Sequence, residues 1–205
     1  MPRRTKEEAL DTRRRILDAA ESLFETQGVS GTSLHAIAMA AGVTRGAIYW
    51  HFKDKSAVFS AMIDRVSLPM EESTALLGMQ GDTPPLTTLL AQLLGLLSSM
   101  AGNEQAQRVV EIVTHKVEYV GDLAAVRERR LQIRHDFVSL LERTLRAGQR
   151  RGEIVPEPSA RTMAIGLHAL LDGLIRNWIL DPGGFDLLAV GRAAVDVHLA
   201  GLAAT

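Results

Sequence analysis

Hydrophobic residues recur every three or four positions along most of this 205-residue chain, and no stretch alternates with the two-residue period of a strand. The pattern predicts an all-α fold of about nine helices. Glycine, proline and asparagine interrupt it and mark the ends of the helices. The predicted helices cover residues 6–27, 33–41, 44–52, 54 or 55 onward, 86–100, 105–119, 121–151, 159–180 and 185–202.

Three local features modify this pattern. Pro69 is expected to bend or break the fourth helix, because proline lacks the amide proton that a helix interior uses. Residues 78–85 are the clearest loop, and Pro156 and Pro158 prevent a helix in the turn before residue 159. The last two helices contain many glycines and alanines, which predicts close approach between helices.

The segment over residues 32–55 contains two short amphipathic helices joined by a turn. Thr32 or Ser33 can cap the first helix, and Gly42 ends it because glycine adopts a positive φ at little cost. Thr44 can cap the second helix, which has an apolar side and a polar side. Two helices joined in this way form the helix-turn-helix pattern, whose second helix enters the major groove of DNA. The sequence therefore predicts a DNA-binding module.

The most specific run spans residues 41–55 and reads AGVTRGAIYWHFKDK. Upstream of it, residues 14–20 read RRILDAA and residues 24–28 read FETQG. Together these segments resemble the TetR family of bacterial one-component repressors, and the resemblance covers residues 12–60. The opening RRTKEEA and the RGA within the main run are similar to the branch that represses multidrug efflux pumps.

The resemblance implies two domains. Residues 1–54 would form an N-terminal three-helix helix-turn-helix domain that binds DNA. Residues 55–205 would form a C-terminal helical domain that binds a ligand and dimerises. The same resemblance implies which residues contact base edges or phosphates: Thr32, Ser33, His35, Thr44, Arg45, Gly46, Tyr49, Trp50, His51 and Lys55.

Each of these assignments has a structural alternative. Trp50 could belong to the core, and His51 could form only local hydrogen bonds. The basic residues Arg3, Arg4 and Lys6 could form an arm that touches DNA or a solvated tail. Arginine at position 45 is the strongest candidate, since its planar fork matches the O6 and N7 atoms of guanine.

Composition and charge narrow the class of protein. Apolar residues make up 46% of the chain, which is enough for a core, and there is no cysteine to form disulfides or thiolate metal sites. No signal peptide and no run of 18 apolar residues is apparent, so we expect a cytoplasmic protein without a membrane span. Residues 1–66 hold ten Lys or Arg and eight Asp or Glu, although the net charge of the whole chain is -1. A modestly basic end on an acidic body is typical of a regulator rather than of a strongly basic architectural protein.

Polar residues on otherwise apolar helices predict a small-molecule site in the C-terminal part. Asp172 and Arg176 lie four residues apart and share a helix face, where they could line a pocket or form a structural ion pair. The resemblance to efflux repressors implies a cavity between the fourth and eighth helices. We expect this cavity to be lined by Leu93, Leu96, Met100, Val110, Val113, Thr114, Phe137, Leu141, His168, Leu171, Asp172, Ile175 and Arg176.

These observations lead to one functional hypothesis: a homodimeric repressor that binds a palindromic operator in double-stranded DNA and is released by a lipophilic effector. An enzyme is disfavoured because no nucleophile–base constellation, phosphate loop or zinc signature appears, and no cofactor is expected. A chromosome-organising protein is disfavoured by the weak basicity. A repressor or activator of a metabolic gene with another effector stays the alternative within the regulator class.

Overall fold

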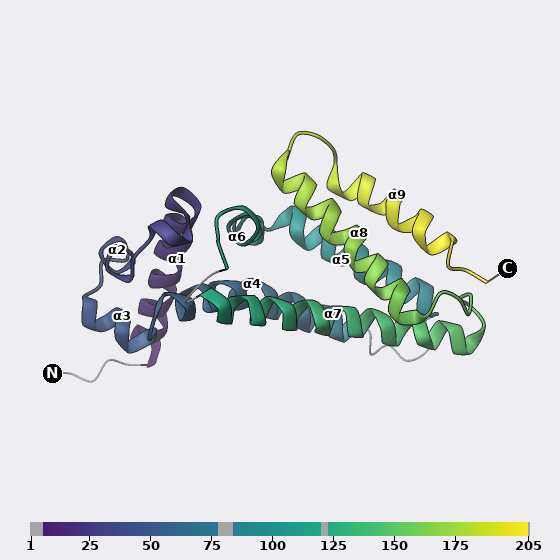
Figure 1. The fold of residues 1–205 in the computed structure, drawn as a ribbon, viewed down its shortest axis with the longest axis horizontal. Helices are drawn as coiled ribbons and strands as arrows, with labels where there is room; N and C mark the ends of the chain where they lie inside the picture. Colours follow the sequence, from purple (N-terminus) through teal and green to yellow (C-terminus); the bar gives the residue numbers. More distant parts are fainter. Residues whose placement is uncertain (1–5, 78–83, 120–122, 205) are drawn as a thin grey trace. The chain divides into compact units, whose positions relative to one another are not determined.

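A computed structural model describes residues 6–77, 84–119 and 123–204. In these ranges the chain is all-helical, which confirms the predicted fold class (Figure 1). The helices are α1 (Lys6–Gly31), α2 (Leu34–Ala40), α3 (Arg45–His51), α4 (Lys55–Leu77), α5 (Pro85–Gly102), α6 (Glu104–His115), α7 (Ala124–Arg151), α8 (Ala160–Leu180) and α9 (Leu187–Ala200).

The helices form two compact units. Unit one combines Met1–Val66 with Arg108–Arg130, and unit two combines Ser67–Gln107 with Leu131–Thr205. The helices α4, α6 and α7 therefore contribute residues to both units. The predicted boundary at residue 54 separates DNA binding from ligand binding and dimerisation, whereas the two units are defined by contacts. The predicted boundary therefore stays a prediction.

The core of unit one joins the first four helices. Phe24 of α1 and Phe59 of α4 are fully buried, with ring centroids 5.6 Å apart. Ile37 from α2 and Ile48 from α3 are also fully buried. Since α2 and α3 have only seven residues each, packing on this core rather than intrinsic helix propensity stabilises them.

The end of α1 differs from the predicted end at residue 27. Gly28 leaves the helical conformation, with φ 72° and ψ 163°, as expected of a terminating glycine. A short helical turn then continues to Gly31. In this turn the Val29 amide donates to the Lys116 carbonyl oxygen at 3.0 Å, so α1 is joined by its backbone to the segment that follows α6.

The prediction that the sixth helix reaches residue 119 is wrong, because α6 ends at His115. The Lys116 carbonyl accepts the Val29 amide instead of a proton from its own helix. The Tyr119 hydroxyl turns back and donates to the Val113 carbonyl at 2.8 Å, and Arg130 donates to that hydroxyl at 2.7 Å. These contacts satisfy the end of α6, although valine spacing alone favoured a longer helix.

Of the two outcomes expected at Pro69, the break is wrong, since α4 runs through this position to Leu77, and the bend stays a prediction. Most of the predicted loop at residues 78–85, the start predicted at residues 121–122, and the arm residues Arg3 and Arg4 lie outside the described residues.

Unit two is built around α5, which packs against both α8 and α9. A Cβ atom on Gly191 of α9 would lie 2.5 Å from the side chain of Leu97 on α5. Glycine at this position therefore allows α9 to approach α5 closely, as the small residues predicted. Gly173 has no such role, because a Cβ there would meet nothing within 4 Å.

Among the described residues, α5 and α8 are long and apolar enough to cross a membrane, by length and composition alone. Core helices of soluble proteins pass the same test. These two helices pack against each other within unit two, where 33% of the apolar stretch of α5 and 28% of that of α8 are buried.

Candidate nucleic-acid interface

The helix-turn-helix consists of α2 and α3 and has a hydrogen-bonded cap at the start of each helix. The Ser33 side chain accepts the Ala36 amide at 3.1 Å, and the Thr44 side chain accepts the Ala47 amide at 3.2 Å. Gly42 adopts φ 63° in the turn between the helices. The predicted cap at Thr44 and the terminating glycine are confirmed, and Ser33 rather than Thr32 caps α2.

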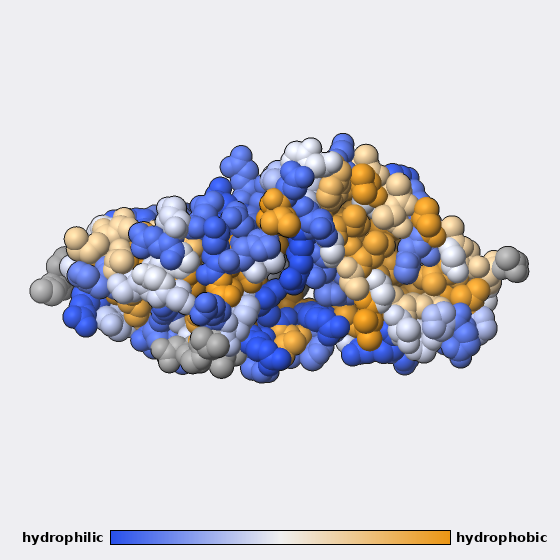
Figure 2. All heavy atoms as spheres, turned by 45° about the horizontal axis from the view of Figure 1, so that its top comes forward, coloured by the Kyte–Doolittle hydropathy of each residue, from blue (hydrophilic) through white to orange (hydrophobic). Residues whose placement is uncertain are grey.

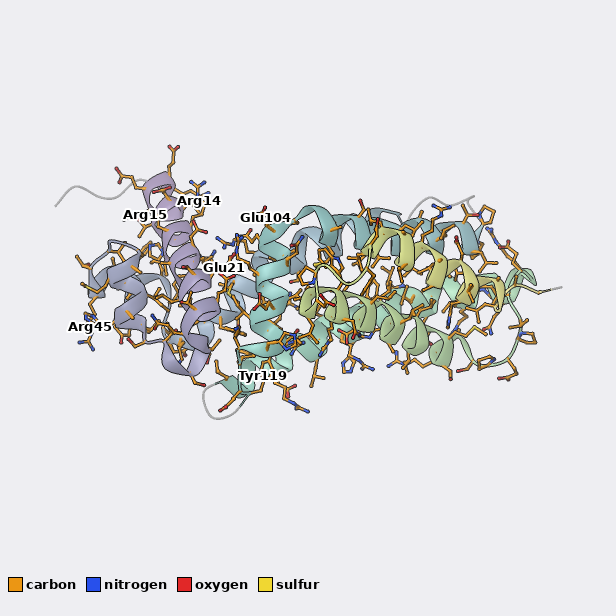
Figure 3. The ribbon with its side chains drawn as sticks, turned by 90° about the horizontal axis from the view of Figure 1, so that it is seen from above. Arg14, Arg15, Glu21, Arg45, Glu104 and Tyr119 are labelled. Atoms are coloured by element: carbon orange, nitrogen blue, oxygen red, sulfur yellow. The ribbon has the colours of Figure 1, made fainter. Side chains whose placement is uncertain are left out.

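One face of α3 is buried and the other is exposed. Ile48 is inaccessible, and Phe52, which follows the helix, is 4% exposed. On the opposite side Trp50 is 73% exposed and Tyr49 is 48% exposed, so the alternative that Trp50 belongs to the core is wrong. Figure 3 shows Arg45 on the outer side of unit one, directed away from α1.

The exposed face of α3 combines cations with aromatic rings. The Arg45 guanidinium carbon lies 5.8 Å from the centre of the Tyr49 ring, within the range of a cation–π contact. The Trp50 and His51 rings meet edge to face at 4.6 Å, with His51 half-buried. Gly46 and His35 are also exposed, and a Cβ on Gly46 would meet no atom closer than 4.0 Å. Nothing in the fold itself therefore requires a glycine at position 46.

Thr32 lies differently from the prediction. Its side chain is buried at 2% exposure, and its hydroxyl donates to the Gly28 carbonyl at 2.8 Å. A phosphate contact by this hydroxyl is therefore not supported. The physical reason is that Thr32 joins α2 to the end of α1, while the cap of α2 falls to the next residue.

Two cations contact backbone carbonyls on either side of α2, one at the junction of α1 and α2 and one just after α2. The Lys55 ammonium lies 2.7 Å from the Val29 carbonyl oxygen and 3.0 Å from that of Thr32. Arg15 of α1 donates to the carbonyl oxygen of Ala41 at 2.5 Å and to that of Gly42 at 3.2 Å. The sequence pattern missed Arg15, because its partners lie 26 and 27 residues away and local spacing carries no signal for them.

A buried carboxylate links three helices of unit one behind this interface. Glu21 of α1 is 4% exposed and pairs with Arg65 of α4 and with Arg108 of α6, the latter at 3.0 Å (Figure 3). Arg65 also pairs with Asp18 at 2.5 Å. A buried charge needs such partners, so this cluster holds α4 and α6 against the helix that supports α2 and α3.

We expect Glu21→Gln to lower the free energy of unfolding by about 2 kcal/mol, since charged hydrogen bonds to two partly exposed arginines are lost. For a chain of this size that corresponds to a fall in Tm of about 4–8 °C. Thermal denaturation followed by circular dichroism measures it. The control is Asp11→Asn, which removes an exposed ion pair with Arg14 and should change Tm by less than about 2 °C. Equal Tm values for the two variants would show that the cluster contributes little.

The predicted ligand-binding residues fall into three groups. Leu93, Met100, Leu141, Leu171 and Ile175 are buried in unit two. The partly exposed residues of unit two are Leu96, Phe137, His168, Asp172 and Arg176. The remaining three belong to unit one: Val110, Val113 and Thr114. The pocket itself therefore stays a prediction.

Within unit two, polar side chains gather around His168. Its ring lies 6.0 Å from that of Phe137, and Asp172 pairs with Arg176 at 2.7 Å. Burial lowers the pKa of His168 below its usual value, Asp172 raises it, and Arg134 and Arg176 lower it. The ion pair is about two-fifths exposed, so it contributes little to stability, and either role predicted for it stays open. In the described part of the chain no group of three or more His, Cys, Asp or Glu is placed to hold a metal ion.

Exposed apolar side chains occur on α8 and α9, and Figure 2 shows hydrophobic residues gathered over this part of unit two. Val197 is 75% exposed and Leu180 is 70% exposed. A shallow hollow of about 480 Å³ runs along these helices, lined by Leu170, Val190, Ala193, Ala194, Val197 and His198. We refer to these six residues as the α8–α9 face. An exposed apolar surface of this kind usually marks an interaction site.

Comparison with known proteins matches both parts of the chain. The family described as bacterial regulatory proteins, tetR family, matches residues 16–62, and the C-terminal region of the MAATS-type transcriptional repressors matches residues 84–203. The transcriptional repressor BepR of Brucella suis biovar 1 is 40% identical over 203 residues, covering 98% of this chain and 97% of BepR.

Two solved structures of repressors are also similar. One is NalD, the secondary repressor of the MexAB-OprM multidrug efflux pump in Pseudomonas aeruginosa, with a TM-score of 0.87 and 35% identity over 97% of this chain and 98% of NalD. The other is the complex of SmeT with triclosan, with a TM-score of 0.84 and 30% identity over 94% of this chain and 92% of SmeT. SmeT represses the multidrug efflux pump SmeDEF of Stenotrophomonas maltophilia.

These matches cover the helix-turn-helix at residues 16–62 and the helical region at residues 84–203, and the family consists of transcription regulators rather than enzymes. The chain belongs to the TetR family of bacterial regulatory proteins, with a C-terminal region of the MAATS type and homology to repressors of multidrug efflux pumps.

Proposed function

We propose that the protein is a cytoplasmic homodimeric repressor that binds a palindromic operator, is released by lipophilic small molecules and controls a multidrug efflux pump. The observation that carries the proposal is the two-sided α3, with Ile48 inaccessible on one side and Tyr49 and Trp50 exposed on the other. A helix anchored on one face presents the other face to the major groove at a defined depth.

Base reading is assigned to Arg45 and Gly46 of α3 and to His35 of α2, all three of which are exposed. Arg45 suits guanine, and the bare backbone at Gly46 allows close approach to a base edge. Because a Cβ at position 46 would meet no atom closer than 4.0 Å, glycine at this position is better explained by the DNA than by the fold.

Phosphate contacts are assigned to the residues that surround the base readers. Ser33 and Thr44 accept amide protons as helix caps, and their hydroxyl hydrogens can still be donated to phosphate oxygens. The exposed aromatic residues Tyr49 and Trp50 and the half-buried His51 complete this set.

Dimerisation is assigned to the α8–α9 face. An apolar surface exposed on two neighbouring helices can pair with the same surface of a second copy around a two-fold axis. Such a dimer presents two α3 helices, which matches the symmetry of a palindromic operator. Val190 and Val197, which are 41% and 75% exposed in the single chain, are the apolar side chains of this face that a second copy would cover.

The effector is proposed to be lipophilic because the predicted lining residues are mostly leucine, valine, isoleucine and phenylalanine. The similarity to SmeT, which has been solved with triclosan, supports this chemical class. The effector acts by binding the DNA-free conformation more tightly than the DNA-bound one.

The proposal is tested through the thermodynamic coupling between operator binding and effector binding. The protein is used to select its operator from random duplexes, and operator affinity is measured with and without triclosan. We expect triclosan to weaken operator binding by about 5- to 150-fold, and the operator to weaken triclosan binding by the same factor. Equal triclosan affinity with and without operator would contradict the proposed release mechanism, and failure to select any duplex would contradict operator binding itself.

A further inference from the structure

Two cations from different helices of unit one contact the backbone on either side of α2: Lys55 of α4 at the junction of α1 and α2, and Arg15 of α1 just after α2. At the junction of α1 and α2, the Lys55 ammonium lies 2.7 Å from the Val29 carbonyl oxygen and 3.5 Å from that of Ser30, both in the last turn of α1, and 3.0 Å from that of Thr32, which precedes the cap of α2. An ammonium has three donors and no acceptor. The three carbonyls therefore match the full donor capacity of Lys55.

At the other end of α2, Arg15 approaches the carbonyl oxygens of Ala41 and Gly42. Carbonyls at a helix C-terminus lack partners within the helix and carry partial negative charge, so a guanidinium is a favourable partner. A Cβ on Gly42 would lie 3.0 Å from the Arg15 guanidinium. Glycine at position 42 thus serves both the positive φ of the turn and the approach of Arg15. Figure 3 shows Arg15 on the side of α1 that faces α2, with Arg14 on the other side.

We infer that Lys55 and Arg15 are positioning residues that fix α2, and through it α3, in the orientation needed for operator binding. The inference rests on the proposed function and replaces the expected phosphate contact of Lys55. A helix of seven residues has no stability of its own, so the interactions at its ends determine how rigidly it is held. Since α2 packs directly against α3, greater mobility of α2 would also change the orientation of the exposed face of α3.

Salt dependence separates this role from a phosphate contact. A cation that neutralises a phosphate contributes about 0.9 to the slope of log affinity against log salt concentration. Removing such a contact from both protomers lowers the slope by about 1.8. Removing a positioning cation weakens binding while the phosphate contacts, and therefore the slope, are retained.

The test uses Lys55→Met and Arg15→Met in the full-length chain, with Lys53→Met and Arg14→Met as matched controls. Lys53 and Arg14 are exposed, and each forms a surface ion pair. We expect each test variant to weaken operator binding by about tenfold or more, with an unchanged salt slope, because charged hydrogen bonds are lost. The conservative variants Lys55→Arg and Arg15→Lys should restore most of the affinity, since either cation can donate to the carbonyls. Active fractions are determined by stoichiometric titration, so that only folded protein is compared.

Amide hydrogen exchange without DNA gives an independent readout. We expect the amides of α2 and α3 to exchange about tenfold faster in the two test variants than in the controls. A slope lower by about 1.8 in Lys55→Met would overturn the inference for this residue, because it would identify a phosphate contact. Unchanged affinity or unchanged exchange would also overturn it. A wild-type protein that binds no duplex would contradict the proposed function, whereas the exchange experiment would still decide on the positioning role.

Discussion

Arg45→Ala is expected to abolish specific operator binding while leaving the fold intact. A bidentate arginine–guanine contact contributes about 1–3 kcal/mol of discrimination. A dimer that reads both half-sites therefore loses about 2–6 kcal/mol, or roughly 30-fold to 10⁴-fold in affinity. The side chain is exposed at the start of α3, so its removal leaves no cavity and no buried group without a partner. Tyr49→Ala should also weaken binding, because Tyr49 contacts the Arg45 guanidinium and lies on the same exposed face.

Fluorescence anisotropy with the selected operator measures this loss, and thermal denaturation verifies the fold. Arg143→Ala is the matched control: Arg143 is an exposed arginine on α7 in unit two, so the same charge change should leave operator affinity within twofold. If Arg45→Ala and Tyr49→Ala both retain full affinity at physiological salt, α3 is not the element that reads the operator.

Val197→Asp is expected to convert the dimer into a monomer. Val197 is 75% exposed in the single chain and lines the α8–α9 face, so in a dimer it would become buried. A two-fold interface receives each substitution twice, and burying an unpaired carboxylate costs several kcal/mol. Operator binding should be lost at the same time, because a monomer engages only one half-site.

Sedimentation velocity at micromolar concentration distinguishes monomer from dimer. The control is Leu10→Asp, the same kind of change at a side chain that is 53% exposed on α1. This variant should stay dimeric. A dimeric Val197→Asp protein would mean that the α8–α9 face is not the contact between protomers.

The sequence was most informative where structure depends on neighbouring residues. The caps at Ser33 and Thr44 and the turn at Gly42 follow from rules that span three or four positions, and the structure has all three. The buried side of α3 followed from helical spacing in the same way. Within the described ranges these local rules were sufficient to place the helix-turn-helix.

Other assignments depended on residues far apart in the chain. Thr32 and Lys55 resembled phosphate ligands by their position, but each contacts carbonyls at the junction of α1 and α2. Just after the end of α6, the Lys116 carbonyl accepts the amide of Val29. Residue spacing within the helix gives no indication of such a long-range hydrogen bond.

The ligand-binding set illustrates another reason why sequence is insufficient. Leu93 and Leu141 are fully buried, while Phe137 and His168 are partly exposed, although all four come from similar positions on amphipathic helices. The same residue types line a cavity or fill a core. Which of the two occurs depends on how the helices pack, and the spacing of side chains along one helix does not determine this.

The bond between the Val29 amide and the Lys116 carbonyl is formed only by the backbone. Alanine scanning would therefore leave this connection between α1 and the end of α6 in place, and would report neither residue as important. Val29→Pro deletes the donor but also closes a ring at a crowded, fully buried position. Replacing the single amide by an ester through chemical ligation removes the donor alone. Because the bond involves no side chain, the side chains at the end of α1 and after α6 can be substituted while the backbone connection between these segments is retained.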